Sequence, residues 1–446
     1  MDRIDEVARR FQSLLGPVTE RMMRESGVIQ RAGKLGGPEL VQTLTLAWLT
    51  NPNASLSQLT QMAAARKVDV SPQALDQRFT PALVGCLERL LGVIVAALSE
   101  TAASDPVTIP LLQRFSGVWI IDSTTCPLPD SAAARWPGCG GHPGDGQAAL
   151  KVQTRLDLLR GRLDRVDLTA GRAQDRAAAV QHAPLPPGSL RLSDQGYFSL
   201  AVFRAIAEAD SFWLSRLPSN IAILTADGER VPPDSVPTWL RRQATANGTV
   251  EVPVRLGLRD RVPARLLAMR VPKVIVRKRR RRLRQDAKKK GQPVSQRSLD
   301  RAGWTILVTN VPTAQLSLTE ARSLYRARWQ IECLFKRWKH DGQLTTSRSQ
   351  KPIRRQVELL AKLIGQVLLH WLSLLSDWTI ANKSLANIEQ VVRDHIRLLA
   401  VNLDRRRDLC RALEHMQRCL RAATRLQHRT KHPATVQYLL NSDLEP

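Results

Sequence analysis

The sequence lacks several features that would place it in familiar classes. Its six cysteines form no C-x-x-C pair, which argues against a zinc ribbon and a disulfide framework and favours a reducing compartment. The first thirty residues are charged and contain no apolar signal core, so we expect a cytoplasmic, nucleoid-associated protein. The apolar run 359–375 is interrupted by Lys, Gln, His and Ser. It predicts a buried core helix, and we expect no contact with a membrane.

Acidic residues are scarce relative to basic ones. The 446 residues include 67 Lys and Arg against 40 Asp and Glu, a formal net charge of +27. A positive field of that size concentrates polyanions, and nucleic acid is the commonest of them. An Arg-rich composition without any nucleic-acid partner is the alternative that charge alone leaves open.

Residues 1–105 are expected to form helices with short connections. Between residues 56 and 91 the pattern resembles a helix–turn–helix, with Ser71 as N-cap and Pro72 in the first turn of the second helix. Gln73, Gln77 and Arg78 lie near the start of that helix, where side chains of such motifs contact base edges. An ordinary helical hairpin explains this segment equally well.

From about residue 106 the pattern changes to strands alternating with helices, which predicts an α/β sheet. SGVWIID is expected to be a strand that ends at Asp122 and is followed by a turn-rich STTCPLPD segment. The stretches ALKVQTRLDLL and RLDRVDLTAG predict a hairpin around Arg160-Gly161, after a Gly/Pro-rich loop at 136–146. LRLSD is a further strand with a carboxylate at its end, followed by a helix over 200–209 and the strand SFWLSRL.

Residues 217–303 depart from that alternation. They contain many prolines and short β patterns (TVEVPVRLGL, VPARLLAMRV, KVIV), which predict an inserted β-rich subdomain. A basic arm at 277–290 follows, with Asp286 as its single acid. Charge blocks of this kind are usually solvated. In a nucleic-acid enzyme we expect this one to lie along phosphates, with the strand TILVTNV returning to the α/β pattern afterwards.

Two carboxylates, Asp122 in WIIDST and Asp194 in LRLSDQGY, occupy expected strand ends. Cleavage of a phosphodiester by two metal ions requires a few carboxylates that converge on ions about 4 Å apart. Magnesium prefers oxygen ligands, so neither His nor Cys is needed. Taken singly, each aspartate is also explained as a strand-end cap or turn residue.

A helical segment, LYRARWQIECLFKRWKH, supplies a third carboxylate. Tyr325, Arg328, Glu332 and Lys339 follow the spacing Y-x2-R-x3-E-x6-K and, at about 100° per residue, lie within an arc of about 60°. The neighbouring arc is apolar and should pack on the sheet; it contains Ile331, Leu334, Phe335 and Trp338. A carboxylate flanked by two cations and a phenol suits the joint binding of metal ions and phosphates.

This signature, together with the DST and DQGY segments before it, resembles the bacterial insertion-sequence-four family of DDE transposases. The resemblance covers about residues 110–375. It implies an α/β fold with a ribonuclease-H-like catalytic core, interrupted by a β-strand insertion and flanked by N-terminal and C-terminal helical domains. The domains expected on this basis are 1–105 (DNA-binding), 106–216 (core, first part), 217–303 (insertion with the basic arm), 304–375 (core, second part) and 376–446 (helical, with subunit contacts).

The resemblance also assigns roles to residues. Asp122, Asp194 and Glu332 would be catalytic and bind two Mg²⁺, with Mn²⁺ as a substitute. Tyr325, Arg328 and Lys339 would grip phosphates at the transposon end. Trp304 is placed where a ring would stack on a flipped-out base, although a core position explains it equally well. Further DNA contacts are expected from Lys336, Arg279, Arg280, Arg281 and Arg282.

The activity implied is hydrolysis at insertion-sequence ends and transfer of the 3′-OH into target DNA. The expected partners are double-stranded DNA and further copies of the chain, as a homodimer or higher oligomer. The alternative is a catalytically inactive protein that only occupies transposon ends. A tyrosine recombinase would use His415, Arg418, His432 and Tyr438, but their spacing is poor; a relaxase would need a His-x-His pair, which the sequence lacks.

Overall fold

The structure is a computed structural model that describes residues 3–30, 33–100, 105–140, 147–289, 291–377, 383–422 and 434–441. The chain forms two compact units, each assembled from separate stretches of sequence. The first unit contains Met1–Ile109, Asp122–Val180 and Trp329–Val436, and the second contains Pro110–Ile121, Gln181–Arg328 and Gln437–Pro446. Lys290, residues 141–146 of the Gly/Pro-rich loop and His432 lie outside the described residues.

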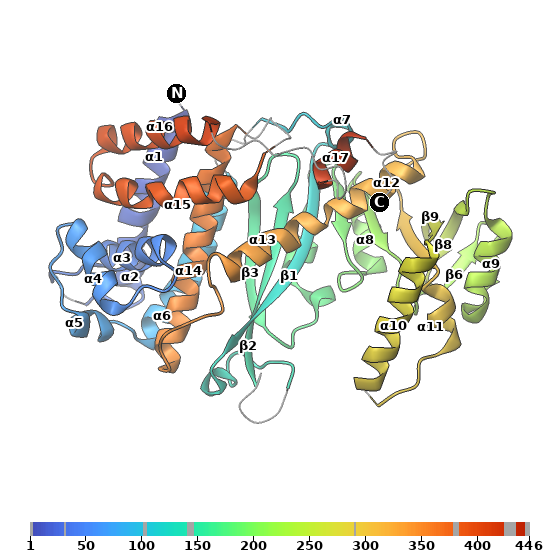
Figure 1. The fold of residues 1–446 in the computed structure, drawn as a ribbon, viewed down its shortest axis with the longest axis horizontal. Coiled ribbons are helices and arrows are strands. Elements are labelled where there is room, and N and C mark those ends of the chain that lie inside the picture. The colour runs from blue at the N-terminus through green and yellow to red at the C-terminus, as the bar shows by residue number, and fades with distance from the viewer. Residues whose placement is uncertain are drawn as a thin grey trace. The chain divides into compact units, whose positions relative to one another are not determined.

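The first unit is built around α14 (Pro352–Ser373), the helix predicted from the apolar run. Every residue of α14 from Val357 to Ser373 is buried, because α3 (Gly37–Thr50), α6 (Pro81–Ser99) and α15 (Leu385–Val401) pack around it (Figure 1). Gly365 allows the close approach of α3, since a Cβ there would lie 3.4 Å from the Thr45 carbonyl oxygen. The unit's other elements are α1 (Arg3–Ser13), the π-helical turn Leu14–Val18, α2 (Thr19–Glu25), α4 (Leu56–Ala65), α5 (Pro72–Asp76), 3₁₀ turns at Asp130–Ala132, Asp175–Ala177 and Leu374–Ser376, α13 (Trp329–His340) and α16 (Arg406–Ala422).

Within the described parts of the chain, two helices, α6 and α14, are long and apolar enough to cross a membrane by length and composition alone. The apolar stretch of α14 is wholly buried within the protein, as expected of a core helix. A buried ion pair of this helix is also satisfied internally: Lys362 lies 2.8 Å from Glu358 and donates to the carbonyl oxygens of Gln343 and Thr346. A buried charge that has both a counter-ion and hydrogen-bond partners avoids most of the penalty of leaving water.

The predicted helix–turn–helix segment is only partly present. Ser71 is the N-cap of α5 and Pro72 is its first residue, as expected, but α5 ends at Asp76 after five residues. Gln77 is its C-cap and Arg78 lies beyond it, so the prediction that these two residues belong to a second long helix was wrong. Thr80 and Pro81 then start a new helix, α6, which explains why α5 is not extended.

The second unit contains most of the sheet. Its strands follow the order β1-β4-β5-β10-β9-β8-β6-β7. β1, β4 and β5 pair parallel. From β5 onward, each strand in this order pairs antiparallel with the next. A core of buried residues from β5, β8, β9, β10 and α8 covers one region of this sheet, with Phe203 and Trp213 stacked 4.2 Å apart. The bounds are β1 (Val118–Leu128), β4 (Leu190–Ser193), β5 (Phe212–Arg216), β6 (Ile223–Thr225), β7 (Arg230–Val231), β8 (Thr249–Leu256), β9 (Val262–Arg270), β10 (Trp304–Thr309), α7 (Pro110–Gln113), α8 (Leu200–Glu208), α9 (Val236–Gln243), α10 (Lys273–Lys289), α11 (Gln296–Arg301), α12 (Leu318–Ala327) and α17 (Thr435–Leu440), besides 3₁₀ turns at Ala179–His182 and Pro233–Ser235.

Strand β1 begins in the second unit and ends in the first, where the order is β3-β2-β1. The predicted hairpin is confirmed: β2 (Ala148–Asp157) and β3 (Leu163–Ala170) pair antiparallel, and Gly161 takes a positive φ in their turn. The prediction that the first strand ends at Asp122 was wrong, because β1 continues through STTCPL to Leu128. Side chains of this second half alternate between buried and exposed, which is the pattern of a strand and not of a turn.

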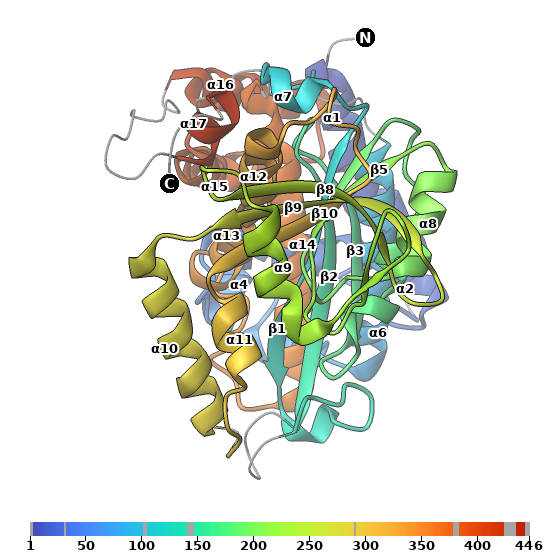
Figure 2. The ribbon, with the colours of Figure 1, turned by 90° about the vertical axis from the view of Figure 1, so that its right-hand side faces the viewer.

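The β-rich insertion is present as β6 to β9, but the prediction of a strand at KVIV was wrong. Lys273 opens α10, which runs through the basic arm to Lys289 and lies beside α11 (Figure 2). The segment KVIV has three apolar residues in four, which fits the periodicity of a strand as well as that of a helix, so the local sequence is ambiguous. The Lys, Arg, Gln and Ala residues that follow favour the helix, since each loses little freedom in it.

Candidate active site

The first predicted carboxylate, Asp122, lies within β1 and is half-buried. It follows four buried residues, Val118 to Ile121, which hold the strand in the interior of the sheet. Its Oδ1 accepts a hydrogen bond of 2.8 Å from the backbone amide of Ser123. The Ser123 hydroxyl in turn donates to Asp175, so the backbone next to Asp122 is tied to a second acidic residue.

Asp175 is neutralised by β2. The Lys151 ammonium lies 3.0 Å from its Oδ1, and the Gln153 side-chain amide donates to the same oxygen. A carboxylate with a counter-ion and several hydrogen-bond donors is fixed in place. We therefore interpret Asp175 as a support for Ser123, and sequence reasoning did not identify it because its partners come from a different strand.

Asp194 follows β4, the parallel neighbour of β1. The register pairs Ile121 with Ser193, so Asp122 and Asp194 each come directly after a member of the same pair. Each carboxylate therefore directly follows a paired position of adjacent parallel strands, as the sequence predicts. The Asp194 Oδ1 accepts hydrogen bonds from the backbone amides of Gly196 and Tyr197, which orients this carboxylate in the DQGY turn.

The third carboxylate lies on a helical stretch that is nearly continuous. α12 starts with a capping box formed by Ser317 and Glu320, and right-handed helical backbone angles persist through Arg328 to α13. Because one residue alone separates the two helices, the predicted periodicity is retained across the signature. Its apolar arc is buried as predicted, with exposures of 6% or less for Ile331, Leu334, Phe335 and Trp338.

Within the second unit, Asp194, Tyr325 and Arg328 lie close enough to interact electrostatically. Burial raises the pKa of the Tyr325 phenol, Arg328 and Arg216 lower it, and the Asp194 charge raises it. The Arg328 guanidinium also lies 6.0 Å from the centre of the Tyr325 ring. Three of the residues that the sequence singled out are therefore neighbours in this unit.

Arg216 is the functional candidate that sequence reasoning missed. It is exposed at the end of β5, where the pairing of Ser193 with Ser215 makes it the counterpart of Asp194 on the next strand. Burial lowers the pKa of Arg279, and the Arg216 charge lowers it further. Burial, Arg297 and then Arg216 also lower the pKa of Arg301, to about 10. Clustered guanidinium groups create the positive potential that attracts phosphate. The strand-end position of the Arg in SFWLSRL was the available signal.

Within the first unit, Lys339 lies near the face of β1 that carries Asp122. Burial raises the pKa of the Cys126 thiol to about 11, and the Lys339 charge lowers it, which places the ammonium close to that thiol. Asp122, Thr124 and Cys126 alternate along β1 and therefore share one face of the strand. Glu332, half-buried on the same helix α13, lies two turns before Lys339.

The other predicted DNA contacts differ in their exposure. Arg281 and Arg282 are exposed on α10, and so is Lys336 on α13, whose ammonium lies 3.9 Å from the Trp329 ring centre. Arg279 instead donates to the carbonyl oxygen of Trp304 and to the Thr305 hydroxyl. Arg280 donates to the Leu299 carbonyl oxygen and lies 3.6 Å from Asp300.

Trp304 begins β10 and belongs to the core of the second unit, with 5% of its surface exposed. The Arg270 guanidinium lies 5.7 Å from its ring centre. Of the two interpretations that the sequence left open, this burial favours a core residue leading into a strand. The ring is surrounded by side chains of the core and not by solvent.

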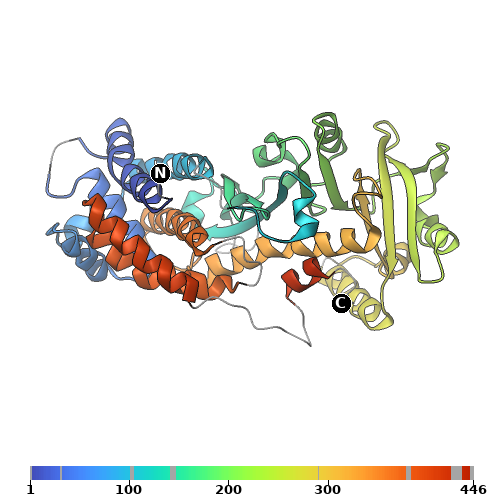
Figure 3. The same cartoon turned by 90° about the horizontal axis from the view of Figure 1, so that it is seen from above.

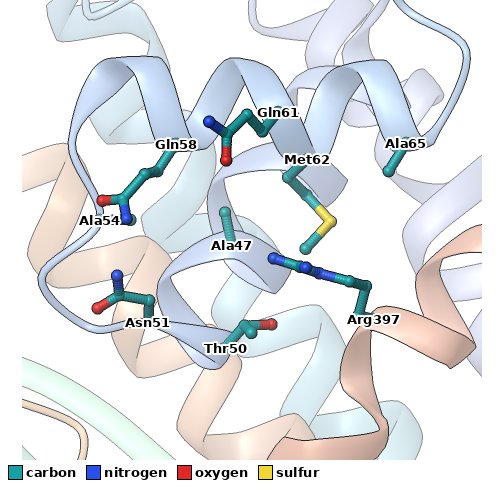
Figure 4. A pocket seen from close by; sticks show the side chains of 9 residues that line it. All are labelled: Ala47, Thr50, Asn51, Ala54, Gln58, Gln61, Met62, Ala65 and Arg397. Carbon is teal, nitrogen blue, oxygen red and sulfur yellow. The ribbon is translucent and has the colours of Figure 1, made fainter.

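A hollow lies beside α4 in the helical part of the first unit (Figure 4). Gln58 and Gln61 of α4 and Arg397 of α15 form its polar rim, and Ala47 and Met62 contribute apolar surface. Gln73 is exposed on the following short helix, α5, and so is Gln77, the C-cap of that helix. Asp76 between them is engaged by Lys351 and Arg354.

A carboxylate that follows a parallel strand and lies near a tyrosine and several cations fits a class of enzymes that use divalent metal ions to cleave and join nucleic-acid phosphodiesters. The family model described as a transposase DDE domain matches residues 113–368, more than half of the chain. The chain belongs to this family and is a DDE transposase, as its sequence signature predicted.

Individual relatives agree with this assignment. The chain is 26% identical over 373 residues to the transposase for insertion sequence element IS231D of Bacillus thuringiensis subsp. finitimus, covering 80% of this chain and 77% of the relative. It is 24% identical over 441 residues to the transposase for insertion sequence element IS231B of Bacillus thuringiensis subsp. berliner, covering 92% and 89%. The transposase for insertion sequence element IS1151 of Clostridium perfringens is 24% identical over 370 residues, covering 78% and 76%.

Proposed function

We propose that this transposase cleaves DNA at the ends of an insertion sequence and joins the released 3′-OH to target DNA, using Asp122, Asp194 and Glu332 as its metal-binding triad. The observation that carries the proposal is the register Ile121↔Ser193 of adjacent parallel strands, because Asp122 and Asp194 directly follow the two members of this pair. The family match supports it, since it spans all three carboxylates. The parallel arrangement of β1, β4 and β5 is also what a ribonuclease-H-like core requires.

The residues fit a pair of Mg²⁺ ions. All three proposed ligands are carboxylates, whose hard oxygen atoms are those that Mg²⁺ and Mn²⁺ prefer. Asp194 is oriented by two backbone amides, and Asp122 by the amide of Ser123, so these ligands need little reorganisation on binding. When bound, the ions polarise the scissile phosphate and favour deprotonation of the attacking water or 3′-OH.

The cations and the phenol hold the substrate. We assign to Arg216, Arg328 and Lys339 the binding of phosphates that flank the scissile bond, because guanidinium and ammonium groups offset the charge of those phosphates. Tyr325 is a hydrogen-bond donor in the same cluster, and its raised pKa keeps the phenol protonated at neutral pH. Holding the DNA in line with the carboxylates lowers the barrier by orientation, without a covalent enzyme intermediate.

DNA beyond the scissile bond is assigned to surfaces of both units. In the second unit, the exposed arginines of α10 form a basic row suited to a phosphate backbone. In the first unit, the amide-lined rim beside α4 and the exposed Gln73 and Gln77 offer hydrogen-bond donors for bases or phosphates. Copies of the chain would assemble as a homodimer or higher oligomer on paired ends.

The test compares cleavage with binding. A linear plasmid carrying the element's own ends is incubated with purified protein and Mg²⁺ or Mn²⁺. Asp122→Asn and Glu332→Gln should abolish cutting and strand transfer while retaining end binding. Each replaces a carboxylate metal ligand with a neutral amide of nearly the same size. Arg328→Gln should weaken binding and reduce its dependence on salt. Arg204→Gln, which removes an exposed charge on α8 that pairs with Asp260, is the matched control and should cut normally.

Metal-dependent cutting by the wild type, lost in Asp122→Asn, would support the proposal. Cutting that survives in both carboxylate variants would exclude the assigned triad. Specific end binding by the wild type without cutting in either metal would favour the alternative of an inactive end-binding protein.

A further inference from the structure

Three potential metal ligands meet where α15 and α16 lie side by side (Figures 1 and 3). His395 comes from α15, and His415 and Cys419 come from α16. Their ligand atoms all lie within 4.8 Å of one another. His395 and Cys419 are half-buried and His415 is exposed, so an ion could reach the cluster from solvent.

The helical spacing explains why the three side chains meet. His415 and Cys419 are four residues apart on α16 and therefore project from the same face. A short connection, residues 402–405, turns the chain back so that α15 and α16 pack through their apolar faces. Ile396 and Met416, the neighbours of the two histidines, are fully buried in that contact, which holds the imidazoles at its edge.

Hydrogen bonds orient His395 as a ligand. Its Nδ1 lies 2.7 Å from the Val391 carbonyl oxygen, and because a carbonyl oxygen can only accept, Nδ1 carries the proton. The Nε2 lone pair of the neutral ring then points toward His415 Nδ1, 3.1 Å away. A histidine whose second nitrogen donates to a backbone carbonyl is the usual arrangement at metal sites, since that bond fixes the tautomer and the ring orientation.

The distances match what a tetrahedral ion requires. With metal–nitrogen bonds of about 2.0 Å, two tetrahedral ligand nitrogens lie about 3.3 Å apart, close to the 3.1 Å between the two imidazoles. A metal–sulfur bond of about 2.3 Å places the sulfur about 3.6 Å from each nitrogen. The three ligand atoms lie within 4.8 Å of one another, so the Cys419 sulfur is near the position that binding requires.

We propose that His395, His415 and Cys419 form a second metal site, specific for a borderline-soft divalent cation such as Zn²⁺, with water as the fourth ligand. Two imidazoles and a thiolate suit Zn²⁺, whereas Mg²⁺ prefers carboxylate and water oxygens. The site is therefore chemically distinct from the carboxylate triad and independent of the proposed chemistry on DNA. Bound metal joins α15 to α16 and stabilises the helical part of the first unit.

The test uses untagged full-length protein stripped with EDTA and titrated with Co²⁺, which reports its ligands by absorption. We expect one equivalent to produce the intense visible bands of tetrahedral Co²⁺ and a thiolate-to-cobalt band in the near ultraviolet. Cys419→Ser should remove the thiolate band. His395→Ala should lower the affinity for Zn²⁺, measured by competition with bound Co²⁺, by at least about 10-fold. Asp122→Asn should leave both bands intact.

Cys410→Ser is the matched control, because Cys410 lies on the same helix but near Asp5 and outside the cluster. It should retain the full cobalt spectrum. Circular dichroism of the apo variants checks that α15 and α16 are still folded. A wild-type protein without a thiolate band at one equivalent of Co²⁺, or a band that persists in Cys419→Ser and is lost in Cys410→Ser, would overturn the proposal.

Discussion

Individual side chains in this protein differ in how far the sequence around them predicts their role. Asp122, Asp194 and Glu332 are recognisable because each lies in a short motif with a fixed order and spacing. Arg216 has no such motif, and its proximity to Tyr325 depends on the pairing of β5 with β4 and on the position of α12. Trp304 shows the opposite case, since its sequence position left open an exposed role that its burial disfavours.

His370 provides a prediction about pH at this scale. It is buried in α14 with its Nε2 2.6 Å from the Gly161 carbonyl oxygen, and burial lowers its pKa to about 4. The unfolded chain, with a histidine pKa near 6.5, therefore binds more protons than the folded chain between pH 4 and pH 6.5. The stability that follows from this difference is fully present above pH 6.5. As the pH falls toward 4, the free energy of unfolding decreases by at most about 3 kcal/mol.

The measurement is the denaturant midpoint of the wild type and of His370→Gln between pH 4 and pH 7. Glutamine can still donate to the Gly161 carbonyl oxygen but does not titrate. The variant should therefore lose less stability on acidification than the wild type. Parallel curves for the two proteins would mean that the pKa of His370 is the same in the folded and unfolded chains, contrary to its burial.

At the scale of elements, α10 separates two kinds of arginine that the sequence presents as one basic block. Arg281, Arg282 and Arg284 are exposed, whereas Arg279 is half-buried and donates to main-chain and side-chain oxygens at the start of β10. One face of the helix therefore anchors it to the sheet, and the opposite face is available for phosphate. Periodicity of charge alone does not reveal this division, because every residue from 277 to 282 is Arg or Lys.

Neutralising the two faces should have different effects. The triple variant Arg281→Gln, Arg282→Gln, Arg284→Gln should bind DNA with a salt slope smaller by up to about 3, and its Tm should not change. Arg279→Gln should instead lower the free energy of unfolding by about 1–3 kcal/mol, because it leaves buried acceptors without a donor. Binding isotherms at several salt concentrations and thermal melts make the comparison. An unchanged salt slope in the triple variant would remove α10 from the proposed DNA surface.

At the scale of the whole molecule, distant parts of the chain share one compact unit. α1, near the N-terminus, packs against α16, more than 390 residues later, and Arg406 bonds to Asp5 at 2.7 Å. Arg66 of the N-terminal helices also donates to the Ala400 carbonyl oxygen and to Asp404. The first and last helical regions therefore stabilise each other within the first unit.

Phe11→Ala tests this shared stability. Phe11 is fully buried in α1, and its truncation should cost about 3–5 kcal/mol. Hydrogen exchange should then show loss of protection in α14, α15 and α16 as well as in α1. Arg9→Ala, on the more exposed side of the same helix, is the control and should change little. A loss of protection confined to residues 3–30 would mean that the N-terminal helices unfold separately.

The β2–β3 hairpin, the buried apolar run of α14 and the hydrophobic arc of α13 were predicted from the sequence pattern, because burial of one face imposes a periodicity on the sequence. The catalytic candidates were found because Asp122, Asp194 and Glu332 lie in short motifs whose order and spacing resemble those of a known transposase family. Tertiary structure decided the remaining points: whether KVIV is a strand, how far β1 continues past Asp122, which arginines of α10 face solvent, and which side chains surround Tyr325. These depend on contacts between residues far apart in the chain, whose free energies exceed the weak local preferences of a few residues.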